Sequence, residues 1–190
     1  MRARSSWGKI SAEDDLLEKI GDWQSKANSE SDPFNKYVSM FIAYNIFYNL
    51  YEKRKKGWVD PDFTFGDSKR AVGTIELVEP DELFEQIRQN LAYYVRIIPV
   101  FKEEYWPKEQ DRKGVRGVAL AENIKANFSD NNKKETIDLL IKWLYKIRCN
   151  LVHGVKSYKD QHQRVLLEQS TSLLDKILTH VLQRYRQKFL

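Results

Sequence analysis

The segment from Pro33 to Gly57 limits the possible folds more than any other part of the chain. Pro33 suits the first position of a helix, and Gly57 suits the position just after its end. Between them, apolar and aromatic side chains recur at three- and four-residue intervals and also occupy the other side of the predicted helix. These side chains are Phe34, Tyr37, Val38, Met40, Phe41, Ile42, Tyr44, Phe47, Tyr48, Leu50 and Tyr51. Such a helix must be central, with the other elements packed around it.

Helical periodicity also predicts the elements that surround this helix. Further main helices are expected over residues 11–27, 80–98, 132–153 and 160–188, and short ones over 67–77 and 119–128. We therefore expect an all-α helical bundle of four to five main helices with short accessory helices. Residues 1–190 are expected to form a single domain, with a core of about 11–188 and an N-terminal extension of 1–10.

The last predicted helix is unusually long for a small bundle. At 1.5 Å per residue it would extend for roughly 45 Å, which exceeds the diameter of such a bundle. This length leaves room for a contact with a second chain.

Composition and charge narrow the possible partners only slightly. The 32 Lys and Arg residues against 27 Asp and Glu give a net charge of +5, which permits a nucleic-acid partner without requiring one. Cys149 is the single cysteine, so nothing indicates secretion. No stretch suits a signal peptide or a membrane-spanning helix, and we expect a cytoplasmic protein with no membrane association. His162 and His180 are isolated in the sequence, so no metal or other cofactor is expected.

A short motif lies at the end of the helix predicted over residues 132–153. Residues 147–154 read Ile-Arg-Cys-Asn-Leu-Val-His-Gly. This segment resembles the R-x4-H signature of the HEPN superfamily, an all-α family whose motif sits near the end of a core helix. A polar residue usually follows the arginine in the family, whereas here Cys149 holds that position and Asn150 comes next. The aromatic run over residues 41–49 is similar to the second helix of many HEPN domains.

This resemblance implies a metal-independent endoribonuclease that acts on RNA as a homodimer. Arg148 would hold the scissile phosphate, and His153 would move protons at the 2′-hydroxyl and the leaving oxygen. Asn150 would orient the phosphate or the histidine. Lys156 and Tyr158 follow the motif closely and are candidates for contact with RNA. A toxin or defence effector of this kind implies an antitoxin or another operon partner protein.

Each candidate residue also has a structural interpretation. Arg148 would then pair with a buried carboxylate from another helix, and His153 would interact with the last carbonyls of its own helix. Asn150 suits a cap or a core hydrogen bond better than catalysis. For the whole chain, the alternatives are a non-catalytic HEPN-like binding or dimerisation module with a protein or nucleotide partner, and a structural domain of a larger complex.

Other polar groups have two interpretations as well. Asn45 and Asn49 lie in an apolar helix, where satisfied core amides are more common than ligand contacts. The basic cluster over residues 53–56 is either a solvated helix end or an RNA contact, and the same choice applies to the basic loop over residues 112–116.

Helix geometry constrains how the motif can work. At 100° per residue, Arg148 lies within about 20° of Ile137, inside the apolar stripe, while His153 lies about 140° from Arg148. A guanidinium in that stripe is costly unless it is paired or faces an interface. One ideal helix cannot direct both side chains at one phosphate. We therefore expect the helix to end at residue 151 or 152, and the site to combine side chains from two protomers.

Overall fold

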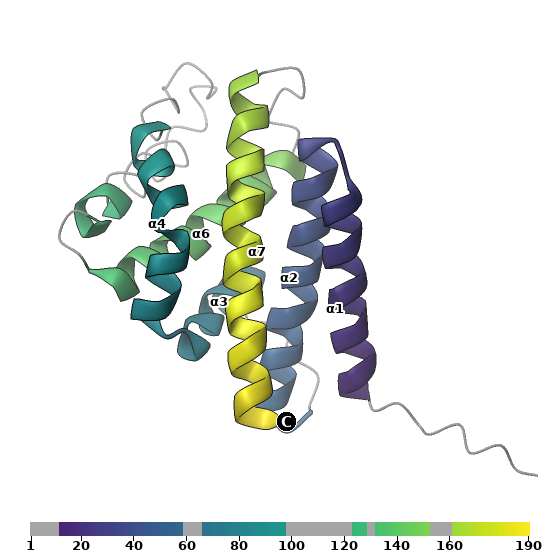
Figure 1. The fold of residues 1–190 in the computed structure, drawn as a ribbon. Helices are drawn as coiled ribbons and strands as arrows, with labels where there is room; N and C mark the ends of the chain where they lie inside the picture. The colour runs from purple at the N-terminus through teal and green to yellow at the C-terminus, as the bar shows by residue number, and fades with distance from the viewer. Residues whose placement is uncertain (1–11, 59–65, 98–122, 129–131, 153–160) are drawn as a thin grey trace, which may run out of the picture.

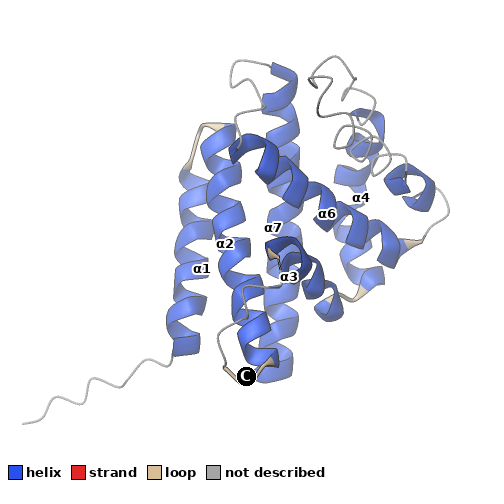
Figure 2. Ribbon diagram, turned by 180° about the vertical axis from the view of Figure 1, so that it is seen from behind, coloured by secondary structure: helices blue, strands red, loops and turns tan. Residues whose placement is uncertain are grey.

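The computed structural model describes residues 12–58, 66–97, 123–128, 132–152 and 161–190 (Figure 1). Every regular element in these ranges is a helix, and no strand occurs among them (Figure 2). The prediction of an all-α fold is therefore confirmed.

Three long helices lie side by side and form the larger part of the fold (Figure 1). They are α1 (Ala12–Ser29), α2 (Pro33–Lys55) and α7 (Gln161–Phe189), and α2 packs against both of the others. The side chain of Asp32 caps α2 by accepting hydrogen bonds from the N–H groups of Phe34 and Asn35, at 3.1 and 3.0 Å. Gly57 follows the end of α2 with a φ of +69°, as a glycine stop requires. The predicted bounds of the central helix are therefore confirmed.

The remaining helices pack on this group and on one another. They are α3 (Asp67–Gly73), the 3₁₀ helix η1 (Thr74–Leu77), α4 (Pro80–Ile97) and α6 (Lys133–Val152). Seen from behind, α6 crosses α2 and α7 at a steep angle (Figure 2). Two buried tyrosines of α2 join the layers: Tyr37 donates to the carbonyl of Leu144 at 2.6 Å, and Tyr44 donates to that of Ala71 at 2.8 Å. The central helix therefore fixes both α6 and α3.

Two elements differ in detail from the sequence prediction. The first helix continues to Ser29, two residues past the end expected at residue 27, because exposed polar side chains do not prevent helical hydrogen bonding. The element expected over residues 67–77 divides after Gly73 into α3 and η1. Of the helix expected over residues 119–128, the described part covers residues 123–128.

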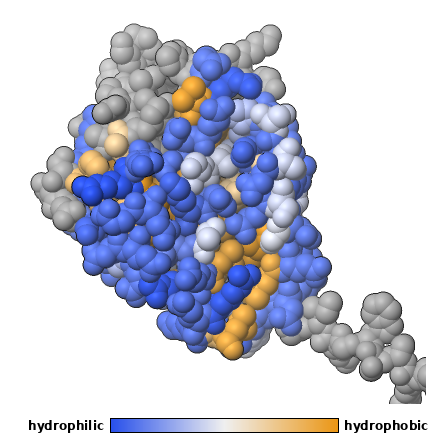
Figure 3. Space-filling view, in the orientation of Figure 1, coloured by the Kyte–Doolittle hydropathy of each residue, from blue (hydrophilic) through white to orange (hydrophobic). Residues whose placement is uncertain are grey.

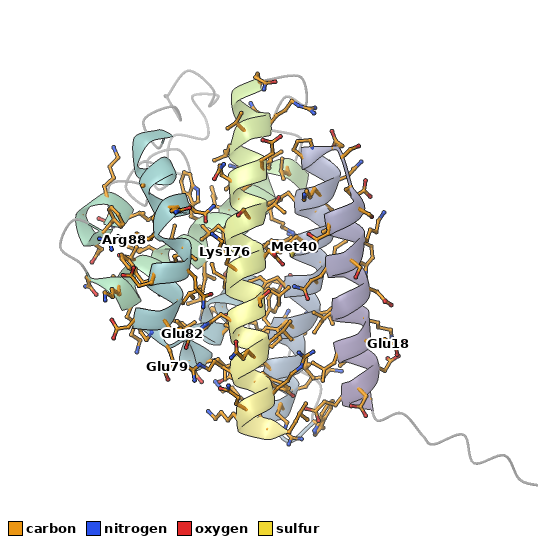
Figure 4. The ribbon with its side chains drawn as sticks, in the orientation of Figure 1. Glu18, Met40, Glu79, Glu82, Arg88 and Lys176 are labelled. Carbon is orange, nitrogen blue, oxygen red and sulfur yellow. The ribbon has the colours of Figure 1, made fainter. Side chains whose placement is uncertain are left out.

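Polar contacts also hold α4 against α7. Lys176 of α7 donates to the carbonyl of Gln86 at 3.0 Å and to the side chain of Asn90 at 2.7 Å (Figure 4). The buried side of α7 faces α2, α4 and η1 of the same chain, so most of its length is used within this fold. A contact of α7 with a second chain remains a prediction.

The described surface is mostly hydrophilic on the face shown in Figure 3, and its largest apolar area is a strip over the lower ends of α7 and α2. Leu190, at the end of the chain, is 69% exposed. None of the described helices combines the length and apolar character that a membrane crossing requires.

Candidate active site around Arg148

Helix α6 carries two of the predicted site residues near its end. Arg148 is half-buried, while Asn150 is only 8% exposed. Ile141, Leu144 and Leu151 of the same helix are buried in the core. Arg148 therefore does lie beside the apolar side of its helix, as the helical spacing predicts.

Two aromatic rings hold the guanidinium of Arg148. Its Cζ atom lies 5.9 Å from the ring centroid of Phe41 in α2 and 5.9 Å from that of Tyr145 in α6. The two rings are 6.0 Å apart and meet edge to face at 61°. We call this pair of rings the aromatic cradle. Both distances are within the range at which a ring attracts a cation, so the cradle offsets part of the hydration that Arg148 loses.

The guanidinium of Arg148 has no carboxylate within 4.0 Å among the described residues, nor a hydrogen-bond acceptor there. The structural interpretation, in which Arg148 pairs with a buried carboxylate, therefore finds no support in the described part of the chain. The contacts to the rings leave its N–H groups available, because a cation–π contact uses the positive charge and not the N–H donors.

An ion pair in α3 influences Tyr145, one of the two rings of the cradle. Asp67 and Arg70 of α3 form an ion pair, and Arg70 is only 8% exposed. Burial is the main cause that raises the pKa of the Tyr145 phenol; Cys149 and the charge of Asp67 add to the rise, while the charge of Arg148 opposes it. The negative charge of Asp67 and the positive charge of Arg148 therefore have opposite effects on the pKa of the Tyr145 hydroxyl.

The side-chain amides of Asn45 and Asn49 in α2 form hydrogen bonds within that helix. Asn49 donates from its side chain to the backbone and side-chain oxygens of Asn45, at 2.9 and 3.1 Å, and Asn45 donates to the hydroxyl of Tyr48. Asn45 and Asn49 are therefore hydrogen-bonded as expected, but both are half-buried and do not lie in the core.

The basic cluster over residues 53–56 is largely neutralised by neighbouring carboxylates. Arg54 pairs with Glu13 at 3.4 Å. Lys55 pairs with Glu76 at 2.8 Å. Lys56 pairs with Glu52 at 3.1 Å. These contacts favour the interpretation of the cluster as a helix end and not as an RNA-binding surface. The basic loop over residues 112–116 lies outside the described residues.

The predicted site is only partly described. His153, Lys156 and Tyr158 lie outside the described residues, so their relation to Arg148 stays a prediction. Asn150 lies on the same helix end as Arg148 but about 200° away around the axis, and it is buried. This position suits the structural interpretation of Asn150 better than a direct contact with a phosphate held by Arg148.

Sequence reasoning did not identify the cradle. One signal was present: Tyr145 precedes Arg148 by three residues, a spacing at which helical side chains meet. Phe41 gave no comparable signal, because it comes from a helix more than a hundred residues earlier in the chain.

No family model matches this chain, and no curated protein and no solved structure matches it either. Any functional argument therefore depends on the residues themselves. Among the described residues, no group of three His, Cys, Asp or Glu side chains is arranged to hold a metal ion.

Proposed function

We propose that the chain is a HEPN-type endoribonuclease that cleaves RNA without a metal ion, with Arg148 and His153 as its catalytic residues. The observation that carries the proposal is the environment of Arg148. Its guanidinium is half-buried against two rings and has no acceptor among the described residues. An arginine held in this way suits an external anion such as a phosphodiester, whose oxygens match its planar set of donors.

The proposed reaction needs no nucleophile from the protein. The 2′-oxygen of the RNA attacks the adjacent phosphorus, and the bond from phosphorus to the 5′-oxygen breaks, leaving a 2′,3′-cyclic phosphate and a 5′-hydroxyl. His153 accepts the proton of the 2′-hydroxyl and then donates a proton to the leaving 5′-oxygen, so that the step neither gains nor loses a proton. Arg148 stabilises the negative charge that builds up on the phosphate oxygens. Asn150 supports the helix end that leads to His153, and Lys156 and Tyr158 contact the RNA beyond it.

The proposed enzyme is a homodimer. On one ideal helix Arg148 and His153 point about 140° apart, which does not suit a single phosphate. Two copies of the α6 end, related by a two-fold axis, would supply the arginine and the histidine of each site from different protomers.

The first test is a cleavage assay on single-stranded RNA in the presence of EDTA. We expect wild type to cleave, and Arg148→Ala and His153→Ala each to lose at least about a hundredfold in rate. Arg88→Ala is the matched control: Arg88 is an exposed arginine of α4 whose nearest carboxylate, on Glu85, is 3.5 Å away (Figure 4). Equal cleavage by all four proteins would contradict the proposal, and intact RNA with wild type would favour a non-catalytic binding module.

A mixing experiment tests the shared site. When Arg148→Ala and His153→Ala proteins are unfolded together and refolded, half of the dimers are mixed, and each mixed dimer contains one complete site. We expect about a quarter of the wild-type activity to return. No recovery, with mixed dimers present, would show that each site draws both residues from one protomer.

A further inference from the structure

We propose that Phe41 and Tyr145 are positioning residues, which hold the Arg148 guanidinium ready for a phosphate of the RNA. This inference rests on the proposed function, since it names what prepares the phosphate-binding group of that site. It concerns two residues that lie outside the R-x4-H motif.

Phe41 forms a rigid floor for the guanidinium. Its ring is buried and lies 6.1 Å from the ring of Tyr44, edge to face at 76°. Tyr44 is fixed in turn, because its hydroxyl donates to the carbonyl of Ala71 at 2.8 Å and also bonds the hydroxyl of Thr74. The floor therefore belongs to the packed junction of α2 and α3 and does not move with the side chains at the surface of α6.

Tyr145 forms the wall of the cradle. It precedes Arg148 by three residues on α6, so its half-buried ring lies beside the guanidinium. The ring also meets Phe41 edge to face, which fixes it against α2. The helix that carries Arg148 therefore also supplies the second ring of the cradle.

The cradle has an advantage over a carboxylate as a holder of Arg148. A carboxylate would occupy the N–H donors and would have to be displaced by each incoming phosphate. Aromatic rings attract the charge, leave the donors available and limit the rotamers of a long side chain before the ligand arrives. Binding of a phosphate then costs less conformational entropy.

The test is a double-mutant cycle between Tyr145 and Arg148, read out as affinity for a single-stranded DNA oligonucleotide. Such an oligonucleotide has the phosphates but lacks the attacking 2′-hydroxyl. We expect Tyr145→Leu to weaken binding by about tenfold, and Tyr145→Phe, which keeps the ring, by no more than about twofold. In an Arg148→Ala background, Tyr145→Leu should cause no further loss.

A purely structural ring would give a different result. If Tyr145→Leu weakened binding equally in both backgrounds, the positioning role would be overturned. Phe189→Leu is the matched control, because the ring of Phe189 contacts a different arginine. The Cζ atom of Arg54 lies 5.4 Å from the centroid of that ring, away from the cradle. We expect this variant to bind the oligonucleotide as wild type does.

NMR of the Arg148 side chain separates failure of this inference from failure of the proposed function. In wild type, ring currents should shift the Arg148 side-chain protons, and rotation of the guanidinium should be slowed; Tyr145→Leu should remove both effects, and Phe189→Leu should not. Unchanged Arg148 signals in Tyr145→Leu would overturn the cradle even if the protein cleaves RNA. A wild-type protein that neither binds nor cleaves, yet shows these signals, would overturn the positioning role together with the proposed function and leave only an ordered arginine.

Discussion

Arg54 lies in the last turn of α2 and Arg148 near the end of α6, and the two differ in how their charge is accommodated. Arg54 lies 5.4 Å from the ring centroid of Phe189, but it also pairs with Glu13 at 3.4 Å and donates to the carbonyl of Phe189 at 3.3 Å. Arg148 lies over two rings and has no such acceptor among the described residues. Among the described residues, Arg148 therefore contacts aromatic rings alone, whereas the N–H donors of Arg54 also have acceptors within the protein.

The surroundings of Arg54 explain what a structural arginine does here. Glu13 of α1 is buried and accepts a hydrogen bond from Tyr185 of α7 as well as from Arg54 of α2. One carboxylate thus joins three helices. No comparable junction involves Arg148 in the described chain.

The largest effect is expected from removing the carboxylate that pairs with Arg54. Glu13→Ala leaves a buried tyrosine hydroxyl and a guanidinium without their acceptor, and we expect the free energy of unfolding to fall by about 3 kcal/mol in urea denaturation. Glu18→Ala, an exposed residue of the same helix (Figure 4), should change it by less than about 0.5 kcal/mol. Equal effects of the two variants would remove the distinction between the two arginines.

A third arginine, Arg184, belongs to a cluster around His180 whose contribution to stability should depend on pH. Arg184 pairs with Glu82 at 2.5 Å, and Glu82 also lies 3.8 Å from the Nδ1 atom of His180. His180 is 2% exposed, and its Nε2 atom accepts a hydrogen bond from the backbone N–H of Glu79. Burial lowers the pKa of His180 below its ordinary value; the carboxylates of Glu82 and Glu79 oppose this, and the charge of Arg184 adds to it.

The sign of the pH effect follows from that lowered pKa. Below a pH of about 6.5 the unfolded chain binds a proton at residue 180 that the folded chain resists, so this contribution to stability is complete above that pH and is lost as the pH falls. His180→Gln keeps an acceptor for the backbone N–H of Glu79. We expect the free energy of unfolding of this variant to fall less steeply with decreasing pH than that of wild type, by up to about 1.4 kcal/mol per pH unit. Denaturation at pH 7.5, 6 and 5 measures it, and identical slopes in both proteins would contradict the assignment.

A smaller effect is expected when Arg148 itself is made apolar. Arg148→Met removes contacts to two rings but frees no buried carboxylate, so the free energy of unfolding should change by no more than about 1 kcal/mol in either direction. Arg54→Met, which leaves the Glu13 carboxylate without its cationic partner, should cost clearly more in the same thermal or urea measurement. A large loss at residue 148 would instead indicate a structural arginine.

The smallest expected effect is in salt dependence. If Arg148 contacts one phosphate, Arg148→Ala should reduce the slope of log affinity against log salt by about 0.7 for a single-stranded oligonucleotide. Arg54→Ala should leave the slope unchanged, because that guanidinium is already paired within the protein. Titrations between low and moderate salt, followed by fluorescence anisotropy, distinguish these outcomes.

Local signals explain most of what the sequence could predict. The bounds of α2 follow from Asp32, Pro33 and Gly57, whose effects on the backbone need no tertiary context. The placement of Arg148 beside the apolar side of α6 follows from helical spacing alone. The division of the 67–77 element after Gly73 was suggested only by the low helix propensity of glycine.

The cradle was beyond sequence reasoning because it depends on how two helices cross. Phe41 meets Arg148 only because α6 passes over α2 at that height, and crossing position is set by packing of the whole core. The other half of the proposed site, with His153, Lys156 and Tyr158, stays a prediction, as do the single-domain organisation, the homodimer and an operon partner.

The bond from Tyr37 to the carbonyl of Leu144 has a consequence for how much the sequence of α6 can vary. The tyrosine bonds a main-chain atom, so it recognises a position along the helix and not the identity of a side chain. Sliding α6 by one residue would rotate its surface by about 100° and put a neighbour of Arg148 above Phe41. The hydroxyl of Tyr37 thus fixes the position of α6 relative to α2. It keeps Arg148 aligned with Phe41 whatever side chain occupies position 144.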